Sequence, residues 1–314
     1  MRRSPLLAGV LAGLARPPRT LASSLFYDAR GSQLFQWITN LPEYYLTRVE
    51  REILTVHGEA IVAPMGRGRC TVVDLGAGDG HKTQLLLRRL LDRGARVTYA
   101  PVDISQAALD VARERVSADT PAIEVRTVRA TYARALRLLQ GDRESGPKLV
   151  LFLGSSVGNL EHQEAHSFLA GLRRALRPGD HVLVGFDLVK PLPVLQRAYD
   201  DAQGLTRAFN LNLLNRLTRE LGADFDLQAF RHVATWDPGR PAMESWLEAT
   251  RRQTVVIGRV AHHFAAGERI HTEISCKYTL EHVGGFAAEA GFVEAGRFTD
   301  RDGWFVDALW RVEA

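Results

Sequence analysis

Cysteine is almost absent from this chain, which has only Cys70 and Cys276 among its 314 residues. Two cysteines that lie far apart exclude the disulfide framework of a small secreted protein and indicate a reducing compartment. Repeats and low-complexity tracts are lacking as well. The hydrophobic content of 46% and the charged content of 24% are instead typical of a globular protein. The length predicts one large domain or two smaller ones, with enough chain to bury a core.

Long apolar runs are also missing. The longest candidate, residues 6–15, is too short to cross a bilayer. Met1-Arg-Arg precedes it as in a signal peptide, but Arg16 and Pro17-Pro18 follow directly, and no convincing cleavage site is present. We therefore expect an N-terminal amphipathic helix in a cytoplasmic protein that has no membrane partner.

Runs of like charge do not occur. Lys and Arg number 40 against 36 Asp and Glu, a net charge of +4, and the arginines are scattered along the chain. Scattered arginines are typical of solvated helix faces and not of a nucleic-acid-binding stripe. His162 and His166 resemble a zinc-protease helix in spacing, but their glutamate is misplaced and no third ligand is evident. We therefore expect neither nucleic acid nor metal as a partner.

What the chain does have is a glycine-rich turn between an apolar strand and a helix. The β-branched run that starts at Thr71 stops at Gly76, Gly78 and Gly80, and leucines at helical spacing follow Lys82. Glycines let a ligand approach the backbone, and a helix N-terminus offers unpaired N–H groups. This order of elements predicts a nucleotide-type pocket.

Two acidic residues narrow the choice of ligand. Asp103 ends the next predicted strand, 96–103, where a carboxylate can hold both ribose hydroxyls of an adenosine ligand. Asp74 stands two residues before Gly76, and Asp-x-Gly-x-Gly-x-Gly is the pattern of S-adenosylmethionine (SAM) enzymes. The sequence therefore favours SAM over a dinucleotide as the cofactor.

Strands and helices alternate regularly after Thr71. Strands are predicted at 71–76, 96–103, 123–130, 148–154 and 181–187. Helices are predicted between them at 82–93, 105–117, 132–140 and 161–176, with Ser105 as an N-cap. A helix at 279–290 and strands at 292–298 and 304–310 would complete a doubly wound α/β sheet of seven strands.

Two segments do not fit this rhythm. Residues 194–235 look helical, and 253–260 and 268–277 are predicted to be antiparallel strands joined around Gly267. Near the N-terminus, Thr47-x-x-Glu50 fits a capping box that would open a helix running to about Ala63.

The resulting division of the chain has four parts. Residues 1–60 are an N-terminal helical segment, and residues 61–189 are a Rossmann-like domain. Residues 190–275 are an insertion, and residues 276–314 complete the sheet. The first and third parts together are expected to form a second, substrate-binding α+β domain.

Six ordered motifs resemble one known family over nearly the whole chain. They are Phe26-Tyr27-Asp28, Leu41-Pro-Glu-Tyr44-Tyr45, residues 153–160 (LGSSVGNL), Arg197-Ala-Tyr199-Asp-Asp201, Ala223-Asp-Phe-Asp226 and residues 272–277 (TEISCK). Together they resemble the SAM-dependent histidine Nα-methyltransferases of ergothioneine biosynthesis. The resemblance implies three successive methylations of L-histidine to hercynine on a SAM-methyltransferase sheet, with S-adenosylhomocysteine as the second product.

The resemblance also implies roles for individual residues. The cofactor would be held by Gly76, Gly78, Lys82 and Asp103, with Thr131 and Tyr132 at the adenine. The substrate's amino and carboxylate groups would meet Gly154, Asn159 and Tyr199, and its imidazole would meet Tyr44, Glu273 and Ser275. Tyr27 would lie near the amine as the catalytic proton relay.

Two positions depart from the family pattern. Thr131-Tyr132 stands where the family has an Asp-Phe pair, which predicts weaker SAM binding. Ser245 stands where the family commonly has methionine beside the imidazole, so the same reaction on another free amino acid is an alternative. An RNA or protein methyltransferase is a further alternative, and so is a SAM-binding module without catalytic activity. A small amino acid as partner and a monomeric chain complete the expectation.

Overall fold

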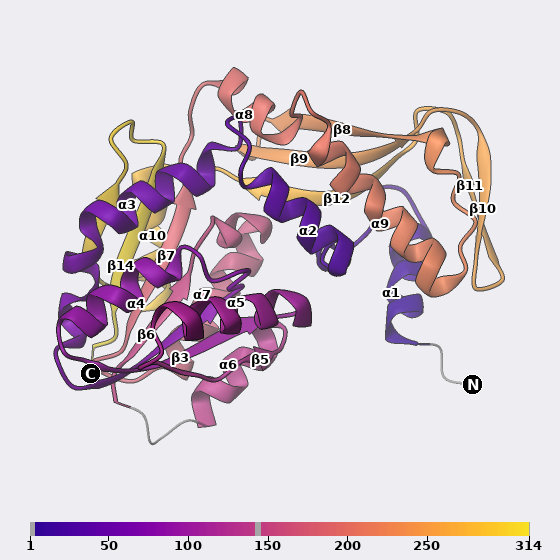
Figure 1. Cartoon of the computed structure of the whole chain (residues 1–314). Coiled ribbons are helices and arrows are strands. Elements are labelled where there is room, and N and C mark those ends of the chain that lie inside the picture. The colour runs from indigo at the N-terminus through magenta and orange to yellow at the C-terminus, as the bar shows by residue number, and fades with distance from the viewer. Residues whose placement is uncertain (1–3, 142–145, 314) are drawn as a thin grey trace. The chain divides into compact units, whose positions relative to one another are not determined.

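The computed structural model describes residues 4–141 and 146–313, and the chain divides into two compact units. Unit 1 comprises Met1–Tyr44 and Pro191–Ser275, and unit 2 comprises Tyr45–Lys190 and Cys276–Ala314. Figure 1 labels their helices and most of their strands. Residues 45–60, which the sequence grouped with the N-terminal segment, belong to unit 2.

Unit 2 contains the doubly wound sheet that the sequence predicts. Its strand order is β13-β14-β7-β6-β2-β3-β4, with the short β5 also paired to β3. The strands are β2 (Arg69–Leu75), β3 (Arg96–Asp103), β4 (Glu124–Val125), β5 (Val128–Arg129), β6 (Lys148–Phe152), β7 (His181–Asp187), β13 (Val293–Thr299) and β14 (Phe305–Arg311). β14 runs antiparallel to β7 and to β13, and the other pairs are parallel. The predicted strand 123–130 is therefore two short pieces, β4 and β5.

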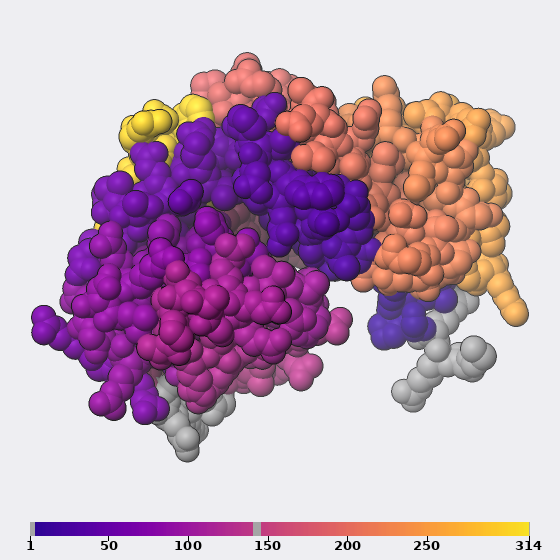
Figure 2. Space-filling view, in the orientation of Figure 1, coloured from indigo at the N-terminus to yellow at the C-terminus, as the bar shows by residue number. Residues whose placement is uncertain are grey.

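Helices pack on both faces of this sheet. They are α3 (Tyr45–Val62), α4 (Thr83–Asp92), α5 (Gln106–Asp119), α6 (Tyr132–Gly141), α7 (His162–Ala175) and α10 (Leu280–Ala290), with short 3₁₀ turns η2 (Ala63–Met65) and η3 (Ser156–Asn159). Alternate strand residues face opposite layers, so that Val72 packs with α3, α4 and α5 while Val73 packs with α6, α7 and α10. In the space-filling view, atoms coloured purple to magenta, from the first half of the chain, form the face of this unit that is turned to the viewer (Figure 2).

Unit 1 is an α+β unit with its own core. Its main sheet has the order β1-β12-β9-β8, and β10 and β11 form a separate hairpin. The strands are β1 (Arg19–Thr20), β8 (Phe230–Asp237), β9 (Ala242–Ala249), β10 (Gln253–Ile257), β11 (Val260–Phe264) and β12 (Arg269–Cys276). The helices are α1 (Pro5–Leu14), α2 (Ala29–Ile38), α8 (Leu192–Tyr199) and α9 (Leu205–Leu221), with 3₁₀ turns η1 (Ser23–Phe26) and η4 (Leu227–Ala229). Apolar side chains of α1, α2 and α9 pack with Leu247 and Ile270 in one core.

Two sequence predictions for unit 1 are wrong. The helical stretch expected to reach 235 ends at Leu221, and β8 begins at Phe230. The strand expected at 253–260 does not pair with 268–277, because Gly258 and Arg259, both at positive φ, turn the chain back into β11. β12 lies instead between β1 and β9.

The predicted helix near the N-terminus exists as α3, but its predicted capping box does not. The helix already begins at Tyr45, so Thr47 lies inside its first turn. Glu50 is completely buried and its side chain bonds to residues elsewhere in unit 2. The Thr-x-x-Glu spacing is therefore coincidental.

The chain passes between the units at three places, and each adjoins one buried carboxylate of unit 2. Asp187 Oδ2 accepts a hydrogen bond from Tyr45 Oη at 2.7 Å and lies 3.0 Å from Lys277 Nζ. Asp187 Oδ1 accepts from Lys190 Nζ. We call Tyr45, Asp187, Lys190 and Lys277 the Asp187 cluster. Residues on the unit 2 side of all three crossings are thus held at one point.

No helix among the described residues is both long and apolar enough to cross a membrane.

Candidate active site

The glycine turn after β2 is tied to the end of β3. The backbone N–H groups of Gly76 and Ala77 both donate to Val102 O, at 2.8 and 3.2 Å. Gly76 has φ = 75°, and a Cβ at this position would lie 2.9 Å from Tyr132 Oη. Only glycine therefore fits here without strain, and Tyr132, at the start of α6, lies directly against the turn.

Asp103 lies beside this turn at the carboxyl end of β3. Its carboxylate accepts hydrogen bonds from Gly78 N–H at 3.1 Å and from Ser105 N–H at 2.8 Å. Burial raises the pKa of Asp103, and the backbone hydrogen bonds oppose this shift. A carboxylate fixed in this way can accept further hydrogen bonds from ligand hydroxyl groups. Thr131, which precedes α6, is exposed.

Asp74 lies under the turn. It is almost completely buried, and its Oδ2 accepts from Thr83 Oγ1 at 2.6 Å and from Tyr99 Oη at 2.9 Å. Burial raises the pKa of Asp74 to about 6. The side chain therefore anchors the first residue of α4 to the sheet.

Lys82 and Gly154 are brought together by a residue that sequence reasoning missed. Glu50, from α3, bonds through Oε2 to Lys82 Nζ and accepts through Oε1 from Gly154 N–H at 2.6 Å. A Cβ at Gly154, where φ is 71°, would lie 3.3 Å from Lys82 Nζ. Burial alone would lower the pKa of Lys82, but the Glu50 carboxylate raises it above its usual value.

Asn159 closes the η3 turn that follows Gly154. Ser155, between them, has φ = 57°, an uncommon conformation for a residue with a side chain. Its Oγ accepts from Asp187 N–H at 3.1 Å. The loop that carries Gly154 and Asn159 is therefore bound to the end of β7, and Asn159 is half-buried there.

Unit 1 brings two of the expected substrate residues together. Tyr199 Oη, at the end of α8, donates to Ser275 Oγ on β12 at 2.6 Å, and both residues are buried. Glu273 is half-buried two residues earlier on β12, so its side chain lies on the same strand face as Ser275.

The remaining predicted residues of unit 1 belong to two groups. Tyr27 and Tyr44 both have edge-to-face ring contacts with Phe35, at centroid distances of 5.9 and 6.1 Å. Ser245, on β9, has a different neighbour, because its Oγ lies 3.5 Å from His232 Nε2. Burial lowers the pKa of His232 to about 4, so this imidazole is neutral at physiological pH.

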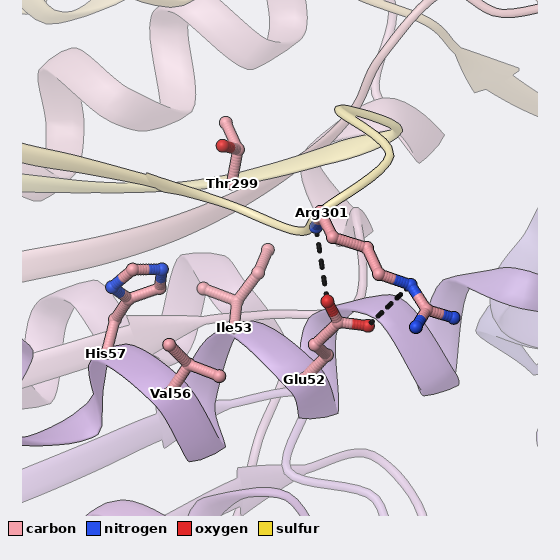
Figure 3. A pocket seen from close by; sticks show the side chains of 6 residues that line it. All are labelled: Glu52, Ile53, Val56, His57, Thr299 and Arg301. Atoms are coloured by element: carbon pink, nitrogen blue, oxygen red, sulfur yellow. Dashed lines mark hydrogen bonds and ion pairs between the residues drawn. The ribbon is translucent and has the colours of Figure 1, made fainter.

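A surface pocket of about 270 Å³ in unit 2 contains none of the predicted site residues. It lies between α3 and the β13–β14 turn, and Glu52 and Arg301 pair across it, with Arg301 Nε 3.9 Å from Glu52 Oε2 (Figure 3). The pocket is therefore not the candidate site. Among the described residues, no group of three His, Cys, Asp or Glu side chains is arranged to hold a metal ion.

The amino-acid sequence is similar to proteins of known activity. A family model described as "Histidine-specific methyltransferase, SAM-dependent" matches residues 6–312. A histidine N-alpha-methyltransferase of Mycolicibacterium smegmatis is 42% identical over 298 residues, which cover 94% of this chain and 91% of that protein. One from Mycobacterium tuberculosis is 40% identical with the same coverage. Ergothioneine biosynthesis protein 1 of Neurospora crassa is 30% identical over 90% of this chain, which matches 32% of the fungal protein.

Proposed function

Because the chain belongs to the family of SAM-dependent, histidine-specific methyltransferases, we propose that it converts L-histidine to hercynine by three successive methyl transfers to the α-amino nitrogen. Hercynine formation would be the first step of ergothioneine biosynthesis, the process that gives the N. crassa relative its name. The observation that carries the proposal is the family match over residues 6–312, which includes every predicted site residue.

The side chains of unit 2 fit SAM by their chemistry. SAM is an adenosine that carries an amino-acid tail, and when bound it supplies an electrophilic methyl group on a sulfonium. Asp103 would accept from the ribose hydroxyls, and the Lys82 ammonium would hold the carboxylate of the tail. Tyr132, which lies against Gly76, would contact the adenine with Thr131 beside it.

Recognition of histidine is assigned to donors and acceptors of matching type. Asn159 and the hydroxyl pair of Tyr199 and Ser275 can donate to a carboxylate or to an imidazole nitrogen. Glu273 can accept a hydrogen bond from an imidazole N–H of the substrate. A substrate with an apolar side chain would leave the Glu273 carboxylate without this partner. Tyr44 would add an aromatic wall.

The chain's part in the chemistry is alignment and proton removal. An amine attacks only through its lone pair, so it must lose a proton before each methyl transfer. Tyr27 Oη would relay that proton to water, and orientation of the amine would supply most of the rate enhancement. The rings of Tyr27, Tyr44 and Tyr199 would stabilise the increasingly quaternary ammonium group of the product by about 0.5–2 kcal/mol each.

The experiment that tests this function is a substrate screen. Purified protein is incubated with SAM and, separately, with each proteinogenic amino acid, and products are followed by mass spectrometry. We expect a product heavier by three methyl groups from histidine alone. The Asp103→Asn variant, prepared in parallel, identifies any contaminating methyltransferase, because a contaminant would be unaffected by the substitution.

The other outcomes separate the alternatives. A product from a different amino acid would show that the same reaction takes place on another substrate. The reason to consider this alternative is Ser245, which stands where the family commonly has methionine. No turnover of any free amino acid would contradict the proposal and favour either a macromolecular substrate or a SAM-binding module without catalytic activity. A cytoplasmic location and a monomeric chain are part of the same proposal, and fractionation and light scattering would test them.

A further inference from the structure

One buried carboxylate of unit 2 binds two residues of the proposed active site at once. Glu50 has no exposed side-chain surface, and its two oxygens have different partners. Oε2 pairs with the ammonium of Lys82, and Oε1 accepts from the backbone N–H of Gly154 at 2.6 Å. The residue before α4 and the loop after β6 are therefore fixed relative to each other by a side chain of α3.

The sheet leaves space for this carboxylate. Gly185, in β7, faces this carboxylate. A Cβ added to Gly185 would lie 2.6 Å from Glu50 Oε1 and 3.0 Å from the ring of Phe305. Gly185 has no positive φ, so its backbone conformation does not itself require glycine. The close approach of Glu50, together with that of the Phe305 ring, is therefore what makes a side chain unfavourable there.

A second acid nearby does not compete for Lys82. Asp307, opposite Gly185 in the register of β7 and β14, is completely buried, and its carboxyl oxygens have no hydrogen-bond partner among the described residues. Burial, reinforced by the Glu50 charge, raises the pKa of Asp307 well above its usual value. The ammonium of Lys82 therefore pairs with Glu50, and Asp307 forms no hydrogen bond with it. We call Glu50, Lys82 and Asp307 the Glu50 cluster.

We propose that Glu50 is a positioning residue that holds Lys82 and the Gly154 loop in the arrangement needed to bind the amino-acid tail of the methyl donor. The inference rests on the proposed function, because it takes SAM as the ligand of Lys82. A lysine has a long and flexible side chain, and a buried acceptor bonded to its ammonium limits the positions that the ammonium can reach. Glu50 itself needs no contact with the ligand.

Two nucleosides distinguish this role from a general structural one. S-adenosylhomocysteine carries the amino-acid tail, and 5′-methylthioadenosine has the same nucleoside without the tail's amino and carboxylate groups. Glu50→Gln keeps an oxygen that can accept from Gly154 N–H but turns an NH₂ group toward Lys82 Nζ, to which it cannot bond. We expect calorimetry to show about tenfold weaker binding of S-adenosylhomocysteine and no change for methylthioadenosine.

A second variant displaces Glu50 without changing any charge. Gly185→Ala adds a methyl group within the space of Glu50 Oε1, so it should weaken S-adenosylhomocysteine selectively as well. Glu52→Gln is the matched control. Glu52 lies on the same helix but pairs with Arg301 at the surface, and both nucleosides should bind this variant as they bind the wild type. Urea unfolding of each variant shows whether it is folded under the assay conditions.

The outcomes are distinct from those for the proposed function. Wild-type protein that binds neither nucleoside would contradict SAM dependence itself. Wild-type binding with unchanged or tighter S-adenosylhomocysteine binding in Glu50→Gln would overturn only the role of Glu50. Equal weakening of both nucleosides would overturn it too, because a disturbed fold would not discriminate between them. If Gly185→Ala does not fold, the Glu50→Gln measurement decides alone.

Discussion

The Asp187 cluster and the Glu50 cluster both bury charge in unit 2, but with opposite balance. Around Asp187, one carboxylate meets two ammonium groups and a phenol, and both of its oxygens are bonded. In the Glu50 cluster, two carboxyl groups stand beside a single ammonium, which pairs with Glu50, and the carboxyl group of Asp307 lacks a hydrogen-bond partner among the described residues. The first is therefore a satisfied network, and the second is an incompletely satisfied one.

The contrast separates buried charges that mainly specify the structure from buried charges that serve function. Buried charges are tolerated when their bonds are made, and a fully bonded network mainly specifies the local structure. An incompletely bonded acid lowers stability and persists in folded proteins most often at functional sites. This difference agrees with their places, since the Asp187 cluster adjoins the chain crossings and the Glu50 cluster adjoins the proposed ligand site.

Removing the charge of Asp187 should have the largest effect. Asp187→Asn leaves Lys190 and Lys277 buried without a counter-charge, so we expect a loss of about 3–5 kcal/mol in the free energy of unfolding at pH 7. Urea titration measures it. Asp119→Asn, which removes an exposed partner of Arg88, is the control and should change stability far less. Equal losses in the two variants would remove the distinction between a buried network and a surface pair.

The pH dependence of stability tests the excess positive charge in the Asp187 cluster. Burial lowers the pKa of Lys190 from 10.5 to about 8. Between these values the unfolded chain holds the proton and the folded chain has released it, so stability rises with pH, by about 3.5 kcal/mol in all. Lys190→Met abolishes this contribution. The wild-type free energy of unfolding minus that of the variant should therefore increase between pH 8 and pH 10.5, and a constant difference would contradict the assignment.

A buried acid with two neutral donors gives a slightly smaller effect of opposite sign. The pKa of Asp74 is raised from 3.8 to about 6 by burial, against the hydrogen bonds from Thr83 and Tyr99. Between these values the folded chain still holds the proton and the unfolded chain has released it. Stability therefore falls as pH rises, by about 3 kcal/mol in all. Asp74→Asn should remove this fall. Unfolding of both proteins at pH 3.5 and pH 6.5 measures it, and parallel curves would show that Asp74 ionises normally in the folded state.

The sequence predicted the parts of the fold whose pattern is local. β2, β3, β6 and β7 are buried apolar runs bounded by turns, and Ser105 caps α5 as expected. β8 and β9 were missed because their polar residues are satisfied by partners distant in sequence or across the sheet. Glu248, for example, is bonded by Arg231 at 2.6 Å and by Arg269 at 2.7 Å. Such partners are not visible in a hydrophobic pattern.

The candidate site shows the same limit. Gly76 and Asp103 follow from a motif, whereas Tyr199, Glu273 and the other substrate residues depended on family resemblance and stay predictions. Glu50 was read as a helix cap because Thr47 stands three residues before it. Its bonds to Lys82 and Gly154 join residues 32 and 104 positions away, and only folding reveals them. The one signal in the sequence was an acid at an otherwise apolar helical position, between Val49 and Ile53.

The convergence of the chain crossings at Asp187 explains how a long segment can leave and rejoin the sheet of unit 2 at one place. Lys190 and Lys277 bond to the same carboxylate, and Val189 N–H donates to Tyr278 O at 2.9 Å, so the two ends of the intervening segment are already neighbours. A long segment that leaves and returns between adjacent chain ends does not interrupt the sheet. The entropy cost of closing such a loop grows only slowly with its length. Residues 191–275, which belong to unit 1, are thus joined to unit 2 without interrupting the order of the strands in its sheet.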